Sequence, residues 1–215
     1  MRFARLFRSR VSGKPAVRHD VRVCVLLVAV LRPMPACAAS CEVPDQAQQL
    51  WPGISGGPSA DYYRAQTFVV GHAGHLTRIE FLGNRSFGRL FEDSLVAEIR
   101  RGFPGTVISS SSVPLAYVPV DRHWVGIDFA ASASVAPAVT YTLVLRTTGG
   151  GCGWLGGQFD PYPRGAAYTR IPEGSWIRHG ADIGDPDYTF RIYVCEPPTA
   201  ITRGTWGTIK SMYRP

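Results

Sequence analysis

Short segments of alternating apolar and polar residues recur along the chain, and turns rich in glycine and proline separate them. Successive side chains of a β-strand point to opposite faces, so a period of two predicts strands with one buried face. The strands predicted in this way are 65–70, 76–82, 94–100, 107–113, 124–129, 140–146, 167–171 and 188–194. No long segment has the 3.6-residue period of an amphipathic helix. We therefore expect an all-β fold, an antiparallel two-sheet β-sandwich of the jelly-roll kind.

The first 38 residues have the three parts of an export signal. A basic region precedes an apolar core at 23–31, and the small residues Ala36-Cys37-Ala38 follow it. The core has nine residues, whereas a membrane-spanning helix needs about 20. We expect a signal peptide at 1–38, no transmembrane span, and an exported protein that is extracellular, periplasmic or attached to the cell surface.

The charge of the chain is concentrated in this leader. The formal net charge is +7, and residues 1–38 hold eight basic side chains and one acidic side chain. The remaining residues carry 15 basic and 15 acidic side chains. The mature protein is therefore neutral overall, and we do not expect nucleic acid as a partner.

Three cysteines remain after removal of the leader, namely Cys41, Cys152 and Cys195. Export permits disulfides, and an odd number leaves one cysteine over. We predict a Cys41–Cys195 disulfide, because these two residues bracket the domain. A pair of Cys152 with Cys195 is the alternative if Cys41 carries a lipid, since Ala38-Ala39-Ser40-Cys41 is similar to a bacterial lipoprotein signal.

The sandwich domain is expected at 39–195, and a Pro-Pro linker opens the short tail at 196–215. In this tail Trp206, Ile209 and Met212 or Tyr213 recur every three to four residues, which indicates one face of a short helix. Such a short helix is marginal in water, so the tail needs a surface on which to fold.

The stretch 140–168 contains the strongest candidate for a binding site. A predicted strand runs into the glycines 149–151, which indicate a loop, and a second turn-forming cluster lies at 160–165. Aromatic rings stack on sugar faces, and nearby carboxylates accept hydrogen bonds from hydroxyl groups. We hypothesise that four side chains converge on one shallow, solvent-facing site for a neutral polar ligand: Trp154, Asp160, Tyr162 and Tyr168.

Two further patterns are similar to known catalytic or metal-binding motifs. Residues 53–57 match G-x-S-x-G, but the segment lacks the flanking strand and helix that the serine nucleophile of a hydrolase needs, so we expect no catalytic residue. The carboxylates of Asp182, Asp185 and Asp187 share one loop, and carboxylate oxygens are ligands that Ca²⁺ prefers. A structural calcium ion there is the alternative to a simple turn, and no other cofactor is expected.

The order of these segments resembles the bacterial choice-of-anchor R type extracellular domain over about 43–194. The most specific element of the resemblance is a series of ten residues: Gly149, Gly150, Trp154, Gly156, Asp160, Pro161, Tyr162, Gly165, Ala167 and Tyr168. The resemblance implies an exported β-sandwich module ahead of varied anchoring signals, and it implies no activity. The chain lacks an LPxTG-like motif and a hydrophobic carboxy-terminal span, so the resemblance does not indicate how the protein is anchored.

These observations lead to one expected function and two alternatives. We expect a non-catalytic extracellular module with a surface or structural role, whose partner is a cell-surface or extracellular polymer or protein. The first alternative is a carbohydrate-binding module that uses the aromatic, glycine-rich loop at 149–168. The second alternative is a secreted hydrolase, which the weak context of residues 53–57 disfavours.

Overall fold

The computed structural model describes residues 43–87, 92–180 and 184–196. The chain divides into two units, Met1–Cys37 and Ala38–Pro215. The first unit and the tail from 197 onward lie outside the described residues. The signal peptide at 1–38 and the helical tail therefore stay predictions.

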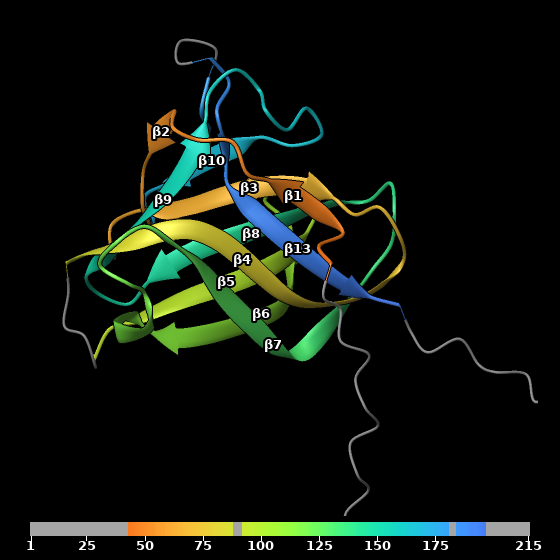
Figure 1. The fold of residues 1–215 in the computed structure, drawn as a ribbon, viewed down its shortest axis with the longest axis horizontal. Coiled ribbons are helices and arrows are strands. Elements are labelled where there is room, and N and C mark those ends of the chain that lie inside the picture. Colours follow the sequence, from red (N-terminus) through yellow and green to blue (C-terminus); the bar gives the residue numbers. More distant parts are fainter. Residues whose placement is uncertain (1–42, 88–91, 181–183, 197–215) are drawn as a thin grey trace, which may run out of the picture. The chain divides into compact units, whose positions relative to one another are not determined.

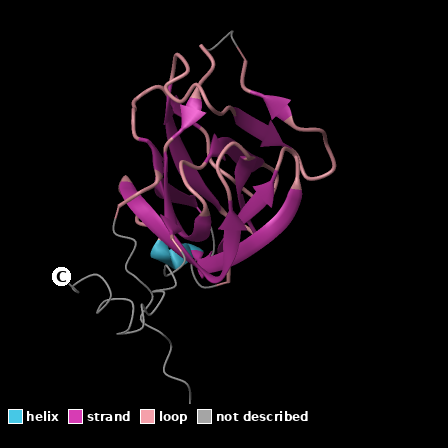
Figure 2. Ribbon diagram, turned by 90° about the vertical axis from the view of Figure 1, so that its right-hand side faces the viewer, coloured by secondary structure: helices cyan, strands magenta, loops and turns pink. Residues whose placement is uncertain are grey.

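Strands make up most of the described chain, and the one helical element in this part is the short 3-10 turn η1 (Leu115–Tyr117) (Figure 2). None of the described residues belongs to a helix that is long and apolar enough to cross a membrane. The strands are β1 (Gln46–Gln48), β2 (Ile54–Ser55), β3 (Tyr63–Val69), β4 (Gly74–Phe87), β5 (Ser94–Arg101), β6 (Thr106–Pro114), β7 (His123–Val135), β8 (Thr140–Thr147), β9 (Gly151–Gly157), β10 (Ala167–Arg170), β11 (Ile177–Arg178), β12 (Asp187–Tyr188) and β13 (Phe190–Cys195).

The strands form two antiparallel sheets (Figure 1). In the first sheet the order is β1-β13-β4-β9-β12, with β7 paired to β4 and β2 paired to β9. In the second sheet the order is β11-β10-β3-β8-β5-β6. This arrangement confirms the predicted all-β, two-sheet sandwich.

The predicted alternation places the core between the two sheets. In β4 the inward side chains Ile79 and Phe81 are fully buried, whereas Arg78 and Glu80 point outward and form an ion pair at 3.1 Å. The inward residues of β7, β8 and β13 join the same cluster. Burial of these apolar faces is the main force that holds the two sheets together.

The segment 70–73 connects β3 of one sheet to β4 of the other. His72 is fixed there by its Nδ1, which lies 2.5 Å from a carboxylate oxygen of the buried Asp45. The crossover thereby fastens the start of the domain to the sandwich.

The structure describes two of the three cysteines that follow the leader, Cys152 and Cys195. Cys152 is a buried free thiol in β9, so the alternative pairing of Cys152 with Cys195 is wrong. Cys195 ends β13, and its sulfur lies 3.4 Å from the Thr77 hydroxyl oxygen. Cys41 lies outside the described residues, and both the Cys41–Cys195 disulfide and the lipid anchor at Cys41 stay predictions.

Candidate functional site

The glycine-rich segment at 151–157 is a buried strand, which corrects the prediction of a display loop. All seven residues of β9 are buried, and Trp154 is 0% exposed. Its ring stacks on Tyr188 with 4.4 Å between centroids and packs edge-on against Phe81. The indole Nε1 donates a hydrogen bond to the Thr189 carbonyl at 2.7 Å. The prediction that Trp154 forms a solvent-facing platform is therefore wrong.

The glycines of β9 serve close packing rather than flexibility. A Cβ at Gly153 would collide with the side-chain amide oxygen of Asn84, and a Cβ at Gly156 would collide with the backbone carbonyl of Asp187. Real Cβ atoms are not accommodated at such distances, so only glycine fits where neighbouring chain segments lie this near. The glycine pattern thus marks a tightly enclosed strand.

The other three predicted site residues also do not converge on one surface. Tyr162 is buried, and its hydroxyl donates to the Val69 carbonyl at 3.2 Å. Tyr168 lies half-buried in a stack with Phe103, with 3.8 Å between ring centroids. Asp160 is exposed. Because Trp154 and Tyr162 are part of the core, the hypothesis of one shared solvent-facing site is wrong.

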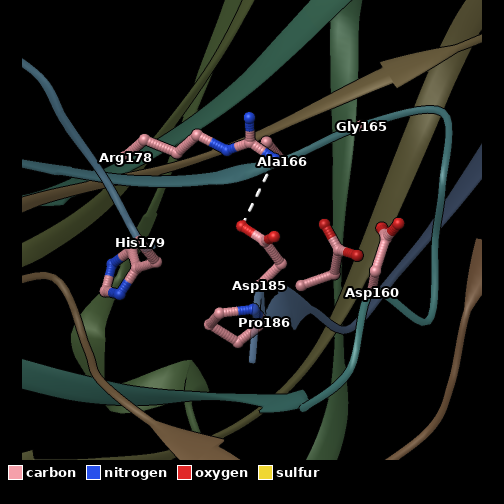
Figure 3. Close-up of a pocket in the computed structure, with 8 residues that line it drawn as sticks. Asp160, Gly165, Ala166, Arg178, His179, Asp185 and Pro186 are labelled. Carbon is pink, nitrogen blue, oxygen red and sulfur yellow. Dashed lines mark ion pairs between the residues drawn. The ribbon is translucent and has the colours of Figure 1, made fainter. Parts of the chain in front are cut away.

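A small hollow is lined in part by Asp160, Asp185 and His179 (Figure 3). The hollow has no room for a water-sized molecule, and Asp185 forms an ion pair with Arg178 at 3.3 Å. Within the described ranges no group of three potential ligands could hold a metal ion. Asp182 lies outside the described residues, so the calcium site as a whole stays a prediction.

Asp187, the third of these carboxylates, points into the interior and is 1% exposed. One oxygen accepts a hydrogen bond from Gln66 Nε2 at 2.7 Å, and the other accepts one from the Tyr162 N–H at 3.0 Å. Burial raises the pKa of Asp187 above its ordinary value, and the two hydrogen bonds offset only part of this rise. The structure gives Asp187 an interior role in fastening β12 to the core.

The raised pKa predicts a pH dependence of stability. Because the folded protein holds the Asp187 proton more tightly than the unfolded chain, this residue stabilises the fold most at pH values below its ordinary pKa of 3.8. The contribution is lost as the pH rises through the higher, folded pKa. Asp187→Asn should remove it, so the free energy of unfolding of wild type minus that of the variant should decrease with rising pH.

Urea unfolding of both proteins from about pH 3 to about pH 7 measures this difference. Burial raises the pKa of Glu98, but hydrogen bonds from Arg100 and Arg146 lower it by a larger amount, so the pKa of Glu98 is lowered overall. The contribution of Glu98 to stability therefore changes with pH in the opposite direction to that of Asp187. Since Glu98 is present in both proteins, its effect cancels in the difference. A difference that increased with pH would contradict the assigned role of Asp187.

A larger groove, of about 390 Å³, lies over the N-terminal half of β9. This volume is within the range of about 300–1,000 Å³ that small-ligand sites occupy. Residues 151–153 form the floor, because β9 pairs with β4 on one side and with the segment 54–59 on the other. The groove is lined by Ser55, Ser59, Asp61 and Tyr62 from one side and by Ser86 of β4 from the other.

A tight turn holds the aromatic residue of this groove. The N–H groups of Ser59 and Tyr62 each donate to the other residue's carbonyl, at 2.9 Å and 3.4 Å. The Ser59 hydroxyl also accepts a hydrogen bond from the Asp61 N–H at 3.2 Å. The Tyr62 side chain is 45% exposed. The ring is therefore presented to solvent on a turn that is already ordered before any ligand arrives.

The groove also contains the serine of the G-x-S-x-G match. Ser55, from the G-x-S-x-G match, is exposed in β2, and a serine nucleophile requires a base within hydrogen-bond reach. The described lining residues include no histidine. Burial raises the pKa of the Cys152 thiol to about 12, so this thiol stays protonated beneath the floor and is not a nucleophile at neutral pH.

Sequence reasoning did not find this groove. Its residues come from parts of the chain that lie far apart, and only the sheet pairing brings them together. The available signal was local: Pro58-Ser59-Ala60-Asp61 is a turn-forming sequence directly before the aromatic Tyr62.

Comparison with models of protein families and with curated protein sequences finds no match for this chain.

Proposed function

We propose that the protein is an exported, non-catalytic extracellular module that attaches to a surface polymer or protein. The leader at 1–38 supports export through its basic, apolar and small-residue regions. The resemblance to the choice-of-anchor R type domain supports the same class of protein.

The observation that carries the proposal is the groove on a rigid sandwich. Binding residues are commonly placed on loops that a rigid scaffold positions, and here the segment 55–62 is held against β9 by strand pairing. Hydroxyl groups, one carboxylate and one ring line this groove. These groups suit reversible contact with a polar partner.

Export and attachment are tested together in a bacterial host that expresses the full chain. We expect the protein outside the cytoplasm with an intact mass that begins near Ala39, and a mass increased by a diacylglycerol on Cys41 would indicate the lipid-anchored alternative. The fluorescently labelled protein should bind saturably to intact cells or to insoluble extracellular polymer. A mass that includes Met1, or no saturable retention on either material, would contradict the proposal.

The hydrolase alternative has its own readout in the same preparation. Chromogenic ester and glycoside substrates should give no turnover above a buffer control. Turnover that Ser55→Ala abolishes would replace the proposed function by hydrolysis, because Ser55 is the serine of the G-x-S-x-G match.

A further inference from the structure

We infer that the groove over β9 binds a neutral carbohydrate and that Tyr62 stacks on one of its sugar rings. This inference rests on the proposed function and names the ligand class and the site. It places the carbohydrate at residues 55–62, 86 and 151–153, away from the stretch 158–168.

The chemistry of the lining matches a sugar more closely than other polar ligands. A pyranose ring has an apolar face of C–H groups and a rim of hydroxyls, so it needs a flat aromatic surface with hydrogen-bonding groups around it. Tyr62 supplies the exposed ring. The hydroxyls of Ser55 and Ser86 are exposed on the two sides of the groove, and Asp61 adds a carboxylate that accepts hydrogen bonds from sugar hydroxyls.

The charges around the groove favour a neutral ligand over an acidic one. Asp61 is the carboxylate among the lining residues, and it would repel a uronate or a phosphate. The guanidinium of Arg64 lies over the Tyr62 ring, with its central carbon 5.4 Å from the ring centroid. Two of its N–H groups are used within the protein, because Nε donates to the Gly57 carbonyl at 3.1 Å and Nη1 donates to the Thr169 hydroxyl.

The backbone around the groove disfavours an extended peptide. A peptide that adds to a sheet needs an edge strand with free N–H and C=O groups. The segment 54–59 already covers the edge of β9, since Ile54 pairs with Gly156, Ser59 pairs with Gly151, and the Cys152 N–H donates to the Pro58 carbonyl at 3.2 Å. The ligand must therefore be held by side chains and ring stacking.

Isothermal titration calorimetry of the secreted protein tests the inference. The probes are neutral oligosaccharides of glucose, mannose and N-acetylglucosamine, with an oligo-uronate of matched length as the charged comparison. At least one neutral probe should bind saturably. Tyr62→Ala should weaken that binding by about tenfold or more, whereas Tyr62→Phe should retain it, because the ring and not the hydroxyl makes the stacking contact.

Tyr117→Ala is the matched control. Tyr117 is a tyrosine that is 73% exposed at the end of η1, and it is not among the lining residues of the groove. This variant should bind like the wild type, and all three variants should melt within a few degrees of it.

Other binding results would contradict the site, the ligand class or the proposed function. Binding that is unchanged in a folded Tyr62→Ala variant would overturn the site. Binding of the oligo-uronate alone would overturn the ligand class. Absence of binding to every neutral probe, together with saturable retention on cells or polymer, would overturn the inference and leave the proposed function standing. Absence of retention on cells and on polymer would contradict both the inference and the proposed function.

Discussion

Trp154→Ala is expected to lower the free energy of unfolding by about 3–5 kcal/mol, which is enough to unfold many domains of this size. The ring is fully buried, and its removal would leave a cavity against Phe81 and Tyr188. It would also leave the Thr189 carbonyl without its indole donor. Urea unfolding followed by circular dichroism measures the loss.

Phe159→Ala is the control from the same stretch of chain. Phe159 is 83% exposed, and surface substitutions change stability by about 0.5 kcal/mol or less. If Trp154→Ala were as stable as Phe159→Ala, the assignment of residues 151–157 to a buried strand would be refuted.

Loss of the predicted Cys41–Cys195 disulfide should have an effect of comparable size. The bond would close a loop of about 150 residues, and the chain-entropy account gives up to about 4–5 kcal/mol for such a loop, less any strain in the folded state. Cys195→Ala should therefore lower the urea midpoint of the oxidised protein to that of the reduced wild type. Cys152→Ala should leave the difference between oxidised and reduced protein unchanged, because Cys152 is a free thiol.

Peptide mapping without reduction decides the linkage. The expected result is one cross-linked peptide pair that contains residues 41 and 195. A cross-linked peptide that contains Cys152, or a Cys195 that reacts with a thiol reagent in the unfolded oxidised protein, would contradict this pairing.

The sequence was sufficient for the fold because the side chains of most strands alternate. Val125, Ile127 and Phe129 point inward from β7 as predicted, and the turn at Gly102–Gly105 separates β5 from β6 as its composition indicates. In these segments local pattern and tertiary packing favour the same structure.

The stretch GCGWLGG was misinterpreted because glycine carries no side chain that could alternate. Glycine also has low β-propensity, so local preference indicates a loop. The strand forms because β4, β12 and the segment 54–59 enclose it from separate parts of the chain. No window of the sequence contains that information, and the predicted site around Trp154 failed for this reason.

The burial of Asp187 could likewise not be predicted from the local sequence. The spacing of Asp182, Asp185 and Asp187 indicates a common ligand, but it does not reveal which carboxylate turns inward. The partners of Asp187 are Gln66 and Tyr162, and both lie more than twenty residues away in sequence. Its burial follows from the packing of β12 on β9.

The position of the ligand is tested most directly by ¹H–¹⁵N spectra of the secreted protein, recorded while a neutral oligosaccharide is added. The structure predicts that shift changes concentrate at residues 55–62, at Ser86 and at residues 151–153, which together form the groove. The spectrum of Tyr62→Ala should show none of these changes at the same concentrations. Changes confined to residues 158–168, or no changes in the groove at saturating oligosaccharide, would contradict the assignment of the groove as the binding site.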